Sequence, residues 1–167
     1  MKRLLRLLRH LMSSPQRLRA RFTPDVLHDV QRAIATTERE HAGEIRFVVE
    51  HALHPARIWQ GLSARERALE VFGQLRVWDT EDNNGILVYV LFAERAVEIL
   101  ADRGIARCVP QEEWAALCRE VEAEFAADGF RAGSLRAIEG AATLLRRHFP
   151  ASTGKTANEL PDQPVLL

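Results

Sequence analysis

A stretch of acidic and amide side chains in the middle of the chain has the residue types that bind hard cations. It reads Asp79-Thr80-Glu81-Asp82-Asn83-Asn84-Gly85 and directly precedes a long apolar run. Carboxylate and amide oxygens are the ligands that Ca²⁺ and Mg²⁺ prefer, and a carboxylate can also act as a general base or a nucleophile. The spacing excludes an EF-hand, because its conserved glycine position is occupied by Asn84 and its bidentate glutamate position by Val90.

The segments around this loop predict a sheet that brings two further carboxylates to it. Residues 44–50 are short and rich in β-branched and aromatic residues, residues 86–92 are a continuous apolar run, and residues 96–101 follow a tight turn, which predicts three strands. An intervening helix makes the first two strands parallel neighbours, and a tight turn makes the last two a hairpin whose register places Asp102 beside Ile86. One sheet edge then collects the candidate metal ligands Glu44, Asp79, Asp82, Asn83, Asn84 and Asp102.

Three interpretations of this acidic edge stay open. The acids can be solvated side chains around an ordinary turn at Asn84-Gly85, which needs no ligand. They can form a weak site for Ca²⁺ or Mg²⁺. They can also supply a catalytic carboxylate.

Helices are predicted on either side of these strands. Thr23-Pro24-Asp25 is typical of a helix start, and Ser63 with Glu66 matches a capping box. Apolar residues at helical spacing predict helices over residues 24–40, 63–76, 111–127 and 131–149. We therefore expect an α/β fold, a three-layer α/β/α sandwich with a small mixed sheet. It would span residues 23–150, and residues 151–167 would form a disordered tail.

The first 22 residues form a basic arm with an amphipathic pattern. They hold seven basic side chains and no acid, whereas the remaining 145 residues hold 16 basic and 23 acidic ones. On a helical wheel the leucines fill one arc and the basic residues fill the other. We expect an N-terminal amphipathic basic helix whose contact residues are Lys2, Arg3, Leu4, Arg6, Leu8, Arg9 and Leu11.

This pattern leaves several uses of the arm open. The helix can lie in the plane of an anionic membrane surface, dock on a partner protein or fold back on its own domain. A signal peptide is not expected, because arginines interrupt every apolar run.

Composition excludes several other classes of protein. A hydrophobic content of 47% is too high for a fully disordered chain, and no uncharged apolar run is long enough to span a membrane. The acidic body argues against nucleic acid as a partner. Cys108 and Cys118 have no metal-ligand spacing, so we expect free thiols in a reducing compartment. This places the protein in the cytoplasm, either free or peripheral to the inner membrane.

Several of these segments together resemble the TPM domain family. They are Gly43-Glu44-Ile45-Arg46-Phe47-Val48-Val49, Asn83-Asn84-Gly85 with the apolar strand after it, Arg95-Ala96-Val97-Glu98-Ile99, Trp114, and Phe130-Arg131-Ala132-Gly133-Ser134-Leu135. The resemblance covers residues 24–149 and implies an α/β/α sandwich. It also implies divalent-cation binding at Asp79, Asp82, Asn83 and Asn84, acid phosphatase activity in some members, and a membrane-associated partner of the LemA type.

The hypothesis that follows is a TPM-like binding module with a weak cation site. It would act at a protein partner or a membrane surface through the basic arm. The alternative is a metal-assisted acid phosphatase that uses the acidic loop.

Overall fold

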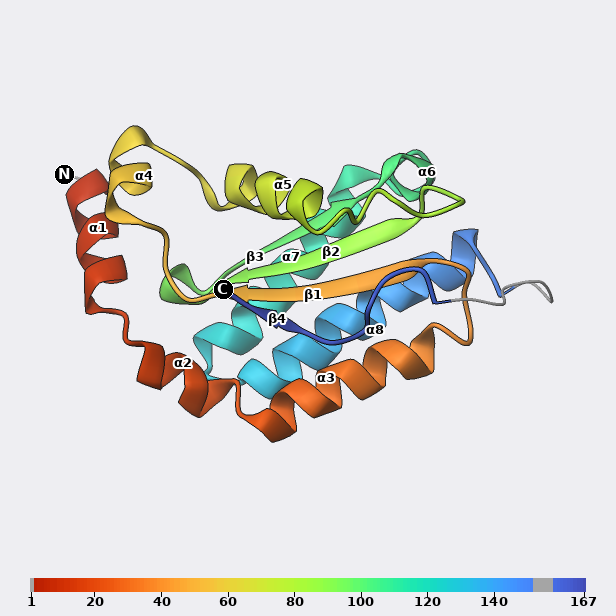
Figure 1. The fold of residues 1–167 in the computed structure, drawn as a ribbon, viewed down its shortest axis with the longest axis horizontal. Helices are drawn as coiled ribbons and strands as arrows, with labels where there is room; N and C mark the ends of the chain where they lie inside the picture. Colours follow the sequence, from red (N-terminus) through yellow and green to blue (C-terminus); the bar gives the residue numbers. More distant parts are fainter. Residues whose placement is uncertain (1, 152–157) are drawn as a thin grey trace.

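The apolar run after the acidic loop forms the central strand of the protein. β2 (Gly85–Leu91) is buried at every residue, with β1 (Glu44–Glu50) parallel on one side and β3 (Ala96–Ala101) antiparallel on the other. Successive side chains of a strand point to opposite faces, so an entirely apolar strand needs a helical layer on each face. The computed structural model, which describes residues 2–151 and 158–167, has these two layers (Figure 1).

Each face of β2 packs into a separate apolar core. Ile86, Val88 and Val90 join the larger core, which lies under α3 (Pro24–Thr37), α7 (Gln111–Ala126) and α8 (Phe130–His148). Leu87, Tyr89 and Leu91 join the smaller core under α4 (Pro55–Gln60) and α5 (Ala64–Gln74). The predicted α/β/α sandwich with a mixed sheet is therefore confirmed.

Local sequence signals place several element boundaries correctly. β1 and β3 have the predicted bounds. The Thr23 side chain caps α3 by accepting the Val26 N–H, and Ser63 and Glu66 form the predicted capping box at the start of α5. α3 ends at Thr37, three residues earlier than predicted.

The basic stretch before α3 forms a helix that packs on the body. α2 (Pro15–Arg21) begins at Ser14, whose side chain accepts the Arg17 N–H. Leu18 and Phe22 are buried in the larger core. The part of the chain outside the core is thus shorter than the expected arm of residues 1–22, and it consists of α1 (Lys2–Met12). α1 packs beside α4 at one end of the molecule (Figure 1).

The end of the chain adds a fourth strand, so the prediction of a disordered tail is wrong for residues 158–167. β4 (Val165–Leu166) pairs parallel with β1, and the sheet order is β3-β2-β1-β4. The Leu167 N–H donates to the Val49 carbonyl, and the His51 N–H donates to the Leu167 carbonyl. These bonds give hydrogen-bond partners to backbone groups at the outer edge of β1. The composition of the tail alone does not show that this edge needs a partner. Residues 152–157 of the predicted tail lie outside the described residues.

Two glycines provide a matched test of the packing at the start of β2. A Cβ on Gly85 would lie 2.0 Å from the Val77 carbonyl oxygen, whereas a Cβ on Gly73 in α5 would meet nothing within 4 Å. We expect Gly85→Ala to lower the free energy of unfolding by about 1–3 kcal/mol through overpacking. Gly73→Ala should raise it by about 0.5–1 kcal/mol, since alanine is the better helix former. Urea unfolding checks both values, and an equal effect of the two variants would contradict this packing.

Candidate functional site

The hairpin brings Asp102 next to the acidic loop, one residue away from the predicted register. Ile86 pairs with Ala101, and the Asp102 N–H donates to the Gly85 carbonyl at 2.9 Å. The shift comes from the turn, where a 3₁₀ turn, η1 (Phe92–Glu94), is followed by Arg95 in the left-handed conformation. The predicted gathering of loop and hairpin at one sheet edge still holds.

Two of the six candidate ligands at this edge are engaged by other groups. The Asp79 carboxylate is exposed and lies 2.7 Å from the Arg76 guanidinium. The Glu44 carboxylate is buried and accepts the backbone N–H groups of Glu159 and Leu160, each at 3.4 Å. The folded end of the chain therefore uses Glu44 as a hydrogen-bond acceptor.

Two other candidates line a small cavity together with arginines. Asp82 and Asn83 share a cavity of about 330 Å³ with Arg103, Gly104 and Arg107. The Arg103 guanidinium donates to Asn83 Oδ1 at 2.9 Å, and the Gly104 N–H donates to the Asn83 carbonyl at 2.8 Å. The positive charges of the two guanidinium groups disfavour a metal cation in the same space.

The last two candidates each keep a buried oxygen that accepts no hydrogen bond from the described part of the chain. Asp102 Oδ1 accepts the Arg103 N–H at the start of α6 (Arg103–Ala106), but Asp102 Oδ2 and Asn84 Oδ1 have no partner within residues 2–151 and 158–167. One carboxylate oxygen and one amide oxygen are far fewer than the six to eight oxygen ligands that Ca²⁺ takes. Across residues 2–151 and 158–167, no three His, Cys, Asp or Glu side chains are grouped to hold a metal. The donor set does not fit a tight metal centre, and a weak cation site stays a prediction.

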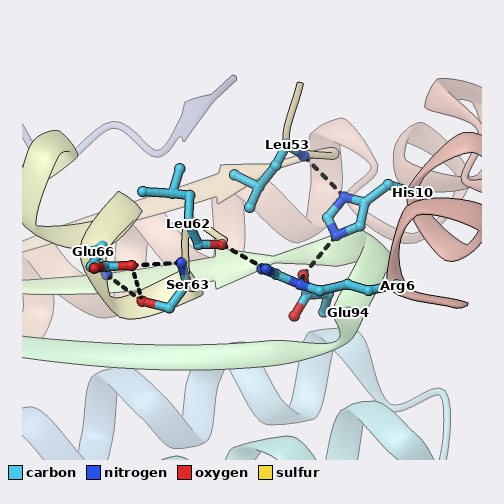
Figure 2. A network of polar contacts seen from close by, with 7 residues as sticks. All are labelled: Arg6, His10, Leu53, Leu62, Ser63, Glu66 and Glu94. Atoms are coloured by element: carbon cyan, nitrogen blue, oxygen red, sulfur yellow. Dashed lines mark hydrogen bonds and ion pairs between the residues drawn. The ribbon is translucent and has the colours of Figure 1, made fainter. Parts of the chain in front are cut away.

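A second polar site lies where α1 meets the body (Figure 2). Glu94, in the turn between β2 and β3, accepts Arg6 Nε at 2.7 Å and lies 2.6 Å from His10 Nε2. Arg6 Nη1 also donates to the Leu62 carbonyl at 2.6 Å. Burial alone raises the pKa of Glu94, but the hydrogen bonds from His10 and Arg6 outweigh it and hold the pKa below its usual value. We call Arg6, His10 and Glu94 the α1 anchor.

The hydrogen bonds of His10 fix the tautomer of its ring. The Leu53 N–H donates to His10 Nδ1 at 3.0 Å, so Nδ1 carries no proton. Nε2 is therefore protonated and donates to Glu94. The His10 side chain is 1% exposed. His10 is not among the predicted contact residues, and its only sequence signal is the spacing of four residues from Arg6, which puts both on one helix face.

The anchor turns the apolar face of α1 away from the body. Leu7 packs at the border of the smaller core, while five other large apolar side chains stay in solvent. Their exposed fractions are 56% for Leu4, 62% for Leu5, 44% for Leu8, 61% for Leu11 and 75% for Met12. We call these five residues the leucine face. In the parts of the chain that the structure describes, no helix is long and apolar enough to cross a membrane.

The predicted arginine contacts of the arm divide into two groups. Arg6 faces the body through the anchor, whereas Arg3 lies over Gly61 and Arg9 is exposed near the end of α1. Within the described residues, four arginines of the first 22 residues form no ion pair with an acid: Arg3, Arg9, Arg17 and Arg19. The side chain of Lys2, another predicted contact, lies outside the described residues.

The anchor predicts that Glu94 holds α1 on the body. Glu94→Gln removes the charge that Arg6 and His10 face, and we expect a loss of about 1–3 kcal/mol in the free energy of α1 docking. Amide hydrogen exchange should then be faster in residues 3–12, with little change in β2. Glu112→Gln, an exposed change of the same charge on α7, is the control. Unchanged exchange in α1 of Glu94→Gln would contradict the role of the anchor.

Comparisons with known proteins agree with this architecture. The family model described as TPM domain matches residues 19–144. Among solved structures, the NMR structure of the BA42 protein from the psychrophilic bacterium Bizionia argentinensis sp. nov. is similar, with a TM-score of 0.76 and 26% sequence identity. The match covers 87% of this chain and 94% of BA42. No curated protein matches. Since the family model spans most of the chain, the protein belongs to the TPM domain family.

Proposed function

We propose that the protein is a peripheral module that binds an anionic membrane surface through the leucine face of α1. The observation that carries the proposal is the orientation of α1, which gives its polar side to the body and leaves five large apolar side chains in solvent. An amphipathic helix with an apolar face and basic flanks lies in the headgroup region of such a membrane.

The charges around the leucine face support an anionic surface. Arg3 and Arg9 flank it on α1, and neither forms an ion pair with an acid of the described chain. Each arginine near an anionic leaflet contributes about 1 kcal/mol of attraction. The rest of the chain after residue 22 has more acidic than basic side chains, so it adds no general attraction, and binding depends on this end.

A tryptophan on the neighbouring helix adds a second type of exposed apolar side chain at this end of the molecule. Trp59 on α4 is 66% exposed, and α4 packs beside α1 (Figure 1). Tryptophan is enriched at membrane interfaces because its ring is apolar and its N–H prefers water. Such an attachment corresponds to a cytoplasmic protein peripheral to the inner membrane. A protein partner, including one of the LemA type, is the competing occupant of the leucine face.

Vesicle binding tests the proposal directly. The full-length protein should co-sediment with vesicles that contain phosphatidylglycerol and much less with vesicles of pure phosphatidylcholine. Substitution of Leu4, Leu8 and Leu11 by serine should weaken binding about 100-fold, since each leucine contributes about 1 kcal/mol when it leaves water in the interface. Leu69→Ser is the control, because Leu69 is an equally exposed leucine on α5.

Two results would overturn the membrane proposal. One is no binding of the wild-type protein to phosphatidylglycerol vesicles at low salt. The other is equal binding by the triple serine variant. Either result would leave the leucine face to a protein partner.

The weak cation site is a separate prediction for the acidic edge. We expect Ca²⁺ to shift the NMR signals of Asn84 and Asp102 with a dissociation constant of about 0.1–1 mM, as for other low-affinity sites. Asp102→Asn should abolish the shifts, and Asp79→Asn, at an exposed residue paired with Arg76, should keep them. No shifts at about 10 mM Ca²⁺, ten times the weaker limit, would rule the site out.

The same variants test the phosphatase alternative. We expect no hydrolysis of a phosphate monoester above background with Mg²⁺ or Ca²⁺, because Asp79 and Glu44 are engaged by Arg76 and by backbone N–H groups. Turnover by the wild-type protein that Asp102→Asn removes would favour the enzyme.

A further inference from the structure

A concave pocket lies next to the Met12 end of the leucine face. It has a volume of about 700 Å³ and is formed where α1 and α2 meet the β2–β3 turn and α7. Its walls carry three arginines, Arg9, Arg17 and Arg95, together with apolar surface from Met12 and Phe92. We call it the arginine pocket. Met12 belongs to both the pocket and the leucine face, so the two surfaces are continuous.

The arginines of the pocket are available to an anionic ligand. Neither Arg9 nor Arg17 forms an ion pair with an acid of the described chain. Arg95 Nη1 donates to the Ala126 carbonyl, and its Nη2 lies 3.9 Å from Asp128, which is closer to Arg21 at 2.5 Å. Most of the donor capacity of the three guanidinium groups is therefore unused.

The two glutamates of the pocket wall do not cancel these charges. Glu94 is the acceptor of the α1 anchor and is already paired with Arg6. Glu122 Oε1 accepts the Val97 N–H at 3.1 Å and satisfies the outer edge of β3. The wall itself has three arginines against two glutamates, and one of these glutamates is paired with Arg6 from outside the wall, which leaves a net positive site.

The Arg95 side chain is held by its contacts, and its backbone adopts a conformation that is unfavourable for arginine. Arg95 has a φ of 53°, in the left-handed region, where an arginine is less favourable than glycine or asparagine. Its guanidinium carbon lies 5.9 Å from the centre of the Phe130 ring, a cation–π distance. The turn thus carries an arginine where its backbone alone would favour another residue, and its guanidinium group is placed by contacts with Phe130 and Ala126.

From these observations we propose that the arginine pocket binds the phosphate group of an anionic phospholipid. The proposal rests on the proposed membrane function and specifies its ligand. Guanidinium groups bind phosphate oxygens in pairs, and the apolar wall of Met12 and Phe92 suits the glycerol and upper acyl chain beside the phosphate. A lipid phosphate at this depth lies at the headgroup level when the adjoining leucine face is inserted.

The first test compares two double variants that remove the same charge. Arg9→Gln with Arg17→Gln changes the pocket, and Arg3→Gln with Arg19→Gln changes unpaired arginines outside it. With phosphatidylglycerol vesicles, we expect the pocket variant to lose at least about tenfold more affinity than the control, in line with one lost charge-assisted contact. Equal losses would overturn the pocket proposal and leave the membrane function intact, since general electrostatic attraction would explain both.

The second test separates a lipid headgroup from free phosphate. We expect monomeric dihexanoyl phosphatidylglycerol to shift the amide signals of residues 92–96, with inorganic phosphate at least about tenfold weaker because it lacks the apolar contact. Arg95→Gln should abolish the shifts. Inorganic phosphate that binds as tightly as the lipid would overturn the headgroup assignment. If the lipid shifts these signals but the wild-type protein binds no vesicles, the membrane function is overturned. If neither probe shifts the signals, the pocket proposal is overturned.

Discussion

The half-buried carboxylate of Glu94 determines which face of α1 meets the body. Glu94 accepts hydrogen bonds from Arg6 and His10, and the ring of His10 accepts a hydrogen bond from the buried N–H of Leu53. Rotation of α1 about its axis would break all three contacts and leave a charged group and a backbone donor unsatisfied, which is expensive in a buried site. The polar side of α1 is therefore the inner side, and everything proposed for the outer side depends on this.

This arrangement reverses the usual orientation of an amphipathic surface helix. Such a helix normally buries its apolar stripe and exposes its charges, and an isolated helix as short as α1 is marginal in water. Here the anchor, Leu7 and the contact with α4 hold the helix, while the leucine face stays largely exposed. An apolar face that the fold does not use and that water disfavours is the type of surface that marks an interaction site.

Much of the fold could be predicted because the relevant signals are local. β1, β2 and β3 are short runs rich in β-branched and other apolar residues, and Ser63 with Glu66 is a capping box readable from four residues. β4 was missed because its pairing with β1 is set by an unsatisfied sheet edge more than a hundred residues earlier in the chain. α2 was missed because Leu18 and Phe22 are too few to make a helical period visible within a basic stretch.

The candidate sites were harder to predict than the fold, for a physical reason. Spacing places Asp79 and Glu44 at the correct sheet edge, but whether a carboxylate is free depends on neighbours such as Arg76 and the backbone of Leu160, which only the folded chain brings close. For α1, periodicity separates leucines from arginines without indicating which side is buried.

The structure shows where the basic arm and the acidic body meet. Seven basic side chains in the first 22 residues and an acidic remainder suggest a general attraction that folds the arm onto the body. Only Arg6 and Arg21 of the described arm pair with body acids, Glu94 and Asp128. The attraction is thus concentrated at two points, which is enough to orient α1 and α2. The remaining arginines of the arm form no ion pair with an acid of the described chain, so one end of an otherwise acidic protein is both basic and apolar.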